Sequence, residues 1–246
     1  MTEVTGPQRK AARFVGGAYL LAMPLALFSG IHVPLQLFVA GNAVATAQNI
    51  VAHERLFRLG VGSDLLAFLV DVVLIAALYT TLEPVNRHLA LFAAFVRLVE
   101  TSLMVTATVS SLDTLRFLSD ADYLKPFAQD QLSALARLAI GAHGTAYNAG
   151  LVFAGVGSTV FCWLWLKSRL VPSWLACLGI VASALLAACT GAFVVFPDLA
   201  KTLTVAVYGG PIFIFELTMG LWLVFKGVRA DAPRVASRHA PAGDSP

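Results

Sequence analysis

Long apolar runs alternate with short polar breaks along the chain, and this pattern constrains the fold more than any other feature. A helix of about 20 apolar residues spans a bilayer. The chain is 58% hydrophobic and 13% charged, whereas soluble domains carry about 25% charged residues. We therefore predict an all-α, polytopic membrane helix bundle. Its six expected transmembrane helices are 14–31, 56–82, 88–112, 138–166, 174–195 and 203–225.

The remaining segments divide the chain into three parts. Residues 1–13 are predicted to be a cytoplasmic N-terminal lead, 14–225 the six-helix transmembrane domain, and 226–246 a disordered cytoplasmic tail. Residues 32–55 are expected to connect the first two spans. Within them, 42–54 has helical periodicity and is interpreted as an outer interfacial helix.

The distribution of positive charge predicts an orientation. Six spans place both termini on one side, and loops on the cytoplasmic side carry an excess of Lys and Arg. The lead, the tail and the second and fourth breaks together hold ten of the 17 Lys and Arg residues. We therefore expect both termini in the cytoplasm and the protein in the inner (plasma) membrane.

Charged side chains within the apolar runs are the candidate functional residues. Ionisable residues at membrane depth are costly, face other helices and mark functional sites. At about 1.5 Å of rise per residue, Asp71 and Arg97 both lie roughly 12–16 Å from the inner face, and Glu216 comes to a similar depth. We predict an ion pair between Asp71 and Arg97, with Glu216 as a second acceptor for the arginine. Glu100 lies one turn from Arg97 on the same face.

Further polar residues extend this group toward the outer side. Asp64 is seven residues from Asp71 and shares its helix face, and His143 comes level with it. The predicted polar column comprises Asp64, Asp71, Arg97, Glu100, His143, Tyr147, Asn148 and Glu216. Because an arginine stays charged when buried, at least one nearby carboxylate should be ionised, and the others are candidates for proton exchange. The same pairs could instead hold helices in register without any ligand.

The sequence does not favour a metal site. His53 and Glu54 near the outer side could join His143 and Asp64, but the spacing matches no zinc motif and the residues come from different helices. His143 has no facing histidine for a haem. Cys162, Cys177 and Cys189 lie in apolar runs without ligand spacing. The chain has no nucleotide-binding loop and no basic patch for nucleic acid. We therefore expect no metal, no cofactor and no nucleic-acid partner.

Glycine and alanine positions predict where helices approach closely. Residues 138–166 carry small side chains at four-residue intervals, together with further glycines, which is typical of a close helix interface. This interface is expected to serve internal packing. The sequence Gly209-Gly210-Pro211 is expected to break the last span, as in the discontinuous helices of some transporters.

Several motifs resemble one bacterial membrane protein family. They are AHExLFRxG at 52–60 with the aspartates that follow, PVNR at 84–87, FxRLVE at 95–100, and the His143-Gly144 pair. Over roughly residues 10–195 the chain is similar to the family called domain of unknown function 4386. The resemblance implies a multi-pass bacterial inner-membrane protein and implies no activity.

Three function classes remain open from the sequence. The first is a membrane protein that binds or moves a small solute, a proton or a lipid through the polar column. The second is a membrane-embedded enzyme, metal-dependent in one version, that uses His143, Asp64 and Glu100. The third is a structural or regulatory membrane subunit without a ligand. In each case the lipid bilayer is the expected partner.

Overall fold

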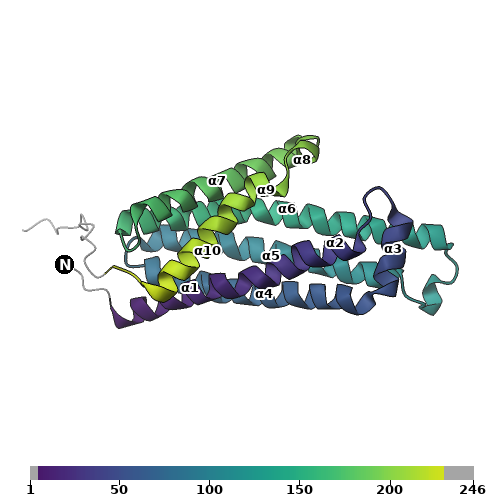
Figure 1. Ribbon diagram of the computed structural model, residues 1–246, viewed down its shortest axis with the longest axis horizontal. Helices are drawn as coiled ribbons and strands as arrows, with labels where there is room; N and C mark the ends of the chain where they lie inside the picture. The colour runs from purple at the N-terminus through teal and green to yellow at the C-terminus, as the bar shows by residue number, and fades with distance from the viewer. Residues whose placement is uncertain (1–4, 230–246) are drawn as a thin grey trace, which may run out of the picture.

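The computed structural model describes residues 5–229, and within them the chain is α-helical with no strand (Figure 1). The prediction of an all-α polytopic helix bundle is confirmed. The helices are α1 (Gly6–Leu27), the π-helix η1 (Phe28–His32), α2 (Val33–Leu37), α3 (Ala43–Ala52), α4 (Glu54–Leu82), α5 (Arg87–Phe117), the 3-10 helix η2 (Asp122–Leu124), α6 (Gln129–Ser168), α7 (Ser173–Val195), α8 (Leu199–Thr202), α9 (Val205–Tyr208) and α10 (Gly210–Phe225).

Short polar side chains determine where several helices begin. Thr5, Asn42 and Asn86 each accept a hydrogen bond from the backbone N–H three residues later, at 3.3, 2.9 and 3.0 Å respectively. Such caps satisfy one of the N–H groups left free in the first helical turn. They place the starts of α1, α3 and α5. Because α1 begins at Gly6, most of the predicted N-terminal lead is helical.

The first apolar element extends beyond its predicted end. We expected a helix over 14–31 and a polar connection over 32–55, but α1, η1 and α2 form one continuous apolar element over residues 6–37. The π-turn explains how the helix passes Pro34. The Val33 N–H bonds to the Phe28 carbonyl, five residues back, and such bulges accommodate a missing donor in a helix. The predicted interfacial helix is present as α3, from Ala43 to Ala52.

The next helices are longer than their predicted spans. α4 and α5 contain the expected segments, and α5 continues to Phe117, beyond its predicted end at residue 112. α6 is a single helix of 40 residues from Gln129 to Ser168, so it begins before the predicted span 138–166. α7 matches its predicted bounds within a residue.

The last predicted span is wrong in its bounds. Residues 203–225 are not one helix, because Leu203 and Thr204 have extended backbone between α8 and α9. The predicted break at Gly209 is confirmed: α9 ends at Tyr208 and α10 begins at Gly210. α10 has 16 residues, about 24 Å, which is less than the hydrocarbon thickness of about 30 Å. Among residues 5–229, five helices are long and apolar enough to cross a membrane.

Six helices pack in a closed ring. α1 packs on α4, α4 on α5, α5 on α6, α6 on α7 and α7 on α10, and α10 returns to α1 (Figure 1). The ring occupies one half of the molecule, which we call the ring half. It carries the Gly6 end of α1 and the Phe225 end of α10 (Figure 1). The other half contains four helices, α2 and the far portions of α4, α5 and α6, with the short α3 packed on them, and we call it the four-helix half.

Each half has its own apolar core. The core of the ring half draws on all six helices and includes the fully buried Phe161, Trp165 and Phe215. The core of the four-helix half is much smaller, centred on Leu37, Ile50 and Phe57. Close helix crossings support the ring: a Cβ on Gly16 would lie 2.9 Å from the Gly220 carbonyl oxygen, and one on Gly155 would lie 2.6 Å from the Ser183 carbonyl oxygen. Glycine permits these approaches of α1 to α10 and of α6 to α7.

Candidate functional site

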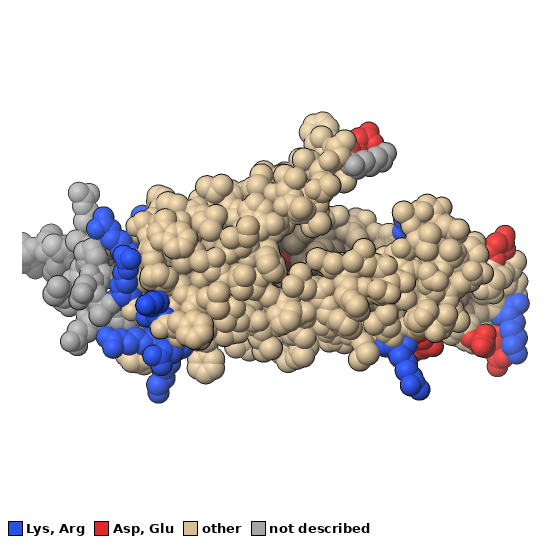
Figure 2. Space-filling view, viewed as in Figure 1, with Lys and Arg blue, Asp and Glu red and all other residues tan. Residues whose placement is uncertain are grey.

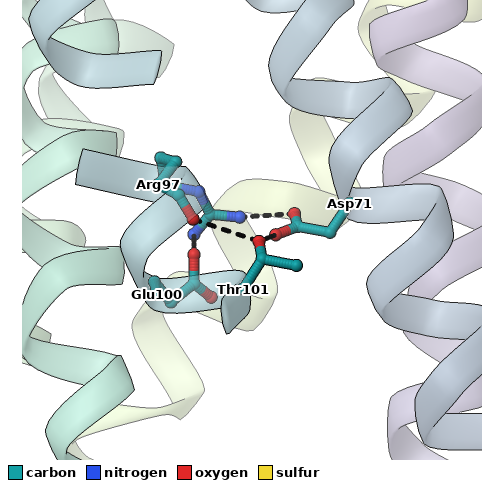
Figure 3. A network of polar contacts seen from close by, with 4 residues as sticks. All are labelled: Asp71, Arg97, Glu100 and Thr101. Carbon is teal, nitrogen blue, oxygen red and sulfur yellow. Dashed lines mark hydrogen bonds and ion pairs between the residues drawn. The ribbon is translucent and has the colours of Figure 1, made fainter. Parts of the chain in front are cut away.

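Arg97 on α5 lies at the centre of the polar group (Figure 3). One terminal nitrogen lies 2.5 Å from Asp71 Oδ1 on α4, and the other lies 3.1 Å from Glu100 Oε2, one turn further along α5. The Asp71–Arg97 ion pair that the depth argument predicted is therefore present. The arginine joins two carboxylates from two neighbouring helices of the ring.

Thr101 completes the contacts of Asp71. Its hydroxyl lies 3.0 Å from Asp71 Oδ2 and 3.0 Å from the Arg97 carbonyl oxygen, and with one hydrogen it donates to one of them at a time. Both carboxylate oxygens of Asp71 therefore have partners (Figure 3). Sequence reasoning missed Thr101. Its position four residues after Arg97, on the same helical face, was the signal available.

Gly157 on α6 makes room for the arginine side chain. A Cβ at this position would lie 2.8 Å from Arg97 Cγ and 3.2 Å from Arg97 Cδ. The aliphatic part of Arg97 therefore passes directly against the backbone of α6. Gly157 is one of the glycines in 138–166 that were expected to serve helix packing, and the structure shows that it accommodates Arg97.

Arg97 and Glu100 are both 7% exposed. A buried charge is costly unless it is paired and hydrogen-bonded, and here the pairing is incomplete. Arg97 Nε and Glu100 Oε2 are buried without a hydrogen-bond partner among residues 5–229, because the Glu100–Arg97 contact is an ion pair without hydrogen-bond geometry. Asp71 is thus fully engaged, whereas Glu100 retains unused acceptor capacity.

Glu216 on α10 is near this group but does not pair with it as predicted. It lies within electrostatic range of Arg97 and Asp71, yet no ion pair joins it to Arg97 in the described chain. The prediction that Glu216 is a second acceptor for Arg97 is therefore wrong. Glu100 takes that place, because it projects from the same helix one turn away and reaches the guanidinium first.

Tyr19 on α1 also faces the centre of the ring, and sequence reasoning did not find it. Its ring packs edge-on against Phe215, with centroids 6.3 Å apart. Arg97, Asp71 and Glu216 all lie within electrostatic range of Tyr19. Polar groups from α1, α4, α5 and α10 therefore converge on one region, and a tyrosine in an apolar run carries no distinctive sequence signal.

The outer members of the predicted column form a second group. His143 Nδ1 on α6 lies 2.9 Å from Ser111 Oγ and 3.0 Å from the Ala107 carbonyl oxygen on α5. The His143 ring stacks on Tyr147 with centroids 5.9 Å apart. His143 lies within electrostatic range of the Asp64 carboxylate. The predicted proximity of Asp64 and His143 is therefore present.

Tyr147 connects the two groups. Asp64, Glu100 and Glu216 all lie within electrostatic range of it. Asn148 is half-buried on the same helix, and its side chain forms no hydrogen bond with another residue in 5–229. Whether any member of the column binds a ligand stays a prediction.

His53 and Glu54, the predicted outer-face candidates, are exposed and make local contacts. His53 Nδ1 lies 3.1 Å from the Asn49 carbonyl oxygen, and Glu54 Oε1 pairs with Arg58 Nε at 2.6 Å. No contact in the described chain joins them to His143. Within residues 5–229, no group of three or more His, Cys, Asp or Glu side chains is placed to hold a metal ion.

A hollow opens on one side of the helix bundle (Figure 2). α8 and α9 project away from the bundle, with α9 held on α7 by an edge-on contact between Phe193 and Tyr208 whose centroids lie 5.3 Å apart. Figure 2 shows the surface hollowed between this projection and the four-helix half, with acidic surface visible inside. The hollow lies at the junction of the two halves.

The fold and its buried charges define a class of protein: a polytopic α-helical membrane protein with an ionic cluster inside its helix ring. Residues 14–227 match the family model described as Domain of unknown function (DUF4386). The chain belongs to this family, as the motif resemblance indicated. No curated protein and no solved structure matched the chain.

Proposed function

We propose that this membrane protein binds protons reversibly at Glu100 and Glu216, as a step in binding or moving a small solute that enters the hollow. One observation carries the proposal. Asp71 and Glu100 pair with the same arginine and Glu216 lies within electrostatic range of it, and in the described chain only Asp71 of the three has both carboxylate oxygens engaged. Excess negative charge in a low-dielectric interior is costly. A proton on Glu100 or Glu216 removes that cost.

The position of the two glutamates supports exchange with the surroundings. Glu216 is half-buried, and Tyr147, which lies within electrostatic range of both glutamates, stacks on His143. Hydroxyl, imidazole and carboxyl groups in such a series are typical of proton relays in membrane proteins. His143 and Asp64 would form the outer end of that series.

Infrared difference spectroscopy of the purified full chain tests the proposal. As the pH is lowered, the wild type should gain a protonated-carboxyl band, and Glu216→Gln and Glu100→Gln should each remove part of it. Glu83→Gln is the matched control, because Glu83 is a surface glutamate paired with Arg87 at 3.5 Å. A band that is unchanged in both buried-site variants would contradict proton binding at these residues.

A second candidate function is a register lock between α4 and α5. The complete pairing of Asp71 by Arg97 and Thr101 favours it, since hydrogen bonds across membrane helices fix their register. If Glu100→Gln and Glu216→Gln leave the carboxyl band unchanged, while Asp71→Asn lowers stability, the cluster has the structural role alone.

We also propose that both termini face the cytoplasm, in the inner membrane of a bacterium. Lys and Arg gather at the ring-half end, whereas the opposite end carries mixed charge (Figure 2). The positive-inside rule places the basic end in the cytoplasm. A reporter domain that is active only in the cytoplasm should be active when fused after Phe225, and one that is active only outside the cytoplasm should not. The opposite result would contradict this orientation.

A further inference from the structure

A groove between α1 and α4 lies outside the polar column. It has a volume of about 650 Å³ and runs along the surface of the ring half. Its apolar lining includes Leu21, Val70 and Val73. Val70 is buried at 9% exposure, whereas Leu21 and Val73 are 53% and 49% exposed. Buried Val70 therefore forms the bottom of the groove, and the exposed side chains of Leu21 and Val73 form its sides.

The polar lining of the groove is confined to one end and is entirely basic. Lys10 and Arg13 on α1 are its charged lining residues, and no acidic residue among residues 5–229 lines it. Both side chains are exposed, and neither forms an ion pair with a residue of the described chain. They lie three residues apart, so they are neighbours on the helix surface. Two unpaired cationic side chains therefore lie next to each other at one end of the apolar groove.

We propose that this groove binds one anionic phospholipid, with the phosphate at Lys10 and Arg13 and an acyl chain along Leu21, Val70 and Val73. From Arg13 to Leu21 the helix rises about 12 Å, which is most of one leaflet of a hydrocarbon core about 30 Å thick. The groove thus has the depth of a lipid chain. Its basic end lies at the ring-half end of the bundle, where Lys and Arg gather (Figure 2) and headgroups are expected.

The charge arrangement selects an anionic lipid over a neutral one. Basic clusters at a membrane surface attract anionic headgroups by about 1 kcal/mol for each Lys or Arg. Two cations should therefore favour an anionic lipid by about 30-fold, because 1.4 kcal/mol is a factor of ten. A transmembrane helix or a second copy of the chain would fill the apolar part and leave the two cations without partners.

Gly17 provides a variant that fills the groove without disturbing the bundle. It lines the groove, and a Cβ at this position would meet nothing within 4 Å. Gly17→Leu should therefore occupy the space of the acyl chain while α1 keeps its contacts. Gly62→Leu is the matched control, because Gly62 on α4 is also open and exposed but does not line the groove.

The test measures, by native mass spectrometry, how tightly the purified full chain binds phosphatidylglycerol and phosphatidylcholine. The wild type should bind phosphatidylglycerol about 30-fold more tightly. Lys10→Gln with Arg13→Gln should abolish this preference, whereas Arg9→Gln with Arg87→Gln, which removes the same charge elsewhere, should largely keep it. Gly17→Leu should weaken binding of both lipids, and Gly62→Leu should not.

Three results would overturn the proposal. An equal loss of the preference for phosphatidylglycerol in the two charge variants would show that the lipid is attracted by overall charge and not by a specific site. Unchanged lipid binding in Gly17→Leu would show that no chain enters the groove. A dimer of the wild type that Gly17→Leu dissociates, with lipid binding intact, would show that a second copy occupies it. An unfolding midpoint equal to that of the wild type establishes, for each variant, that the fold is retained.

Discussion

The ring half and the four-helix half are built from the same long helices but differ in how they bury them. In the ring half, α7 and α10 close the ring, and one large core contains side chains from all six helices. In the four-helix half these two helices are missing, and a small core lies beneath α2 and α3. The polar column crosses the junction, so its inner and outer members have different surroundings.

This difference separates two kinds of polar contact. Arg97 and Glu100 are buried at 7% exposure each, inside the ring. Asp64, His143 and Tyr147 are only half-buried, at the junction. An ionised group is costly where water is excluded and much less so where it stays in contact with water. The inner group should therefore dominate stability, and the outer group should have little effect on it.

The largest effect is expected from Arg97→Met. It leaves Asp71 and Glu100 buried without their cation, and removing one partner of a buried pair costs about 3–5 kcal/mol. Arg87→Met, which removes the exposed partner of Glu83, should cost at most about 1 kcal/mol. Unfolding free energies in mixed micelles measure both. Similar values for the two variants would mean that the ring does not isolate its charges from water.

The next largest effect is expected at the crossing of α6 and α7. Gly155→Ala would place a Cβ 2.6 Å from backbone atoms of Ser183 and Ala187, and such overpacking costs about 1–3 kcal/mol. Gly144→Ala on the same helix meets nothing within 4 Å and should be neutral or slightly stabilising, because alanine favours a helix over glycine. Unfolding free energies in the same micelles compare the two variants. Equal changes would contradict the inference that the two halves differ in how tightly their helices pack.

A smaller effect is expected from single hydroxyl groups. Thr101→Val removes a hydrogen bond to Asp71 inside the ring and should cost about 0.6 kcal/mol, the average for such bonds in membrane helices. Ser111→Ala, beside the half-buried His143, should cost less, because water can replace its contact. A larger loss for Ser111→Ala would reverse the ranking of the two regions.

Much of the fold followed from hydropathy and helix geometry. Apolar runs located α4, α5 and α7, because a bilayer requires long uninterrupted helices. Pairing Asp71 with Arg97 required only that both lie at one depth on adjacent helices. The same arithmetic did not distinguish Glu216 from Glu100 as the second acceptor, since it gives depth along a helix and not the distance between helices.

Other features depend on contacts that a single sequence does not encode. The helix continues through Pro34 because a π-turn shifts its hydrogen bonds, and no residue pattern signals that shift. Tyr19 and Thr101 resemble ordinary residues of apolar spans until α1, α4 and α5 are placed together. The splitting of the last span into α9 and α10 was indicated by glycine and proline, whereas the extended backbone at Leu203 and Thr204 was not.

A double-mutant cycle on Arg97 and Asp71 tests the central claim, that charges from separate helices converge and stabilise one another inside the ring. Unfolding free energies are needed for Arg97→Met, Asp71→Leu and the double variant. The 2.5 Å contact predicts a coupling of about 2 kcal/mol, within the range for residues in direct contact. Additive effects, within about 0.5 kcal/mol, would contradict the claim.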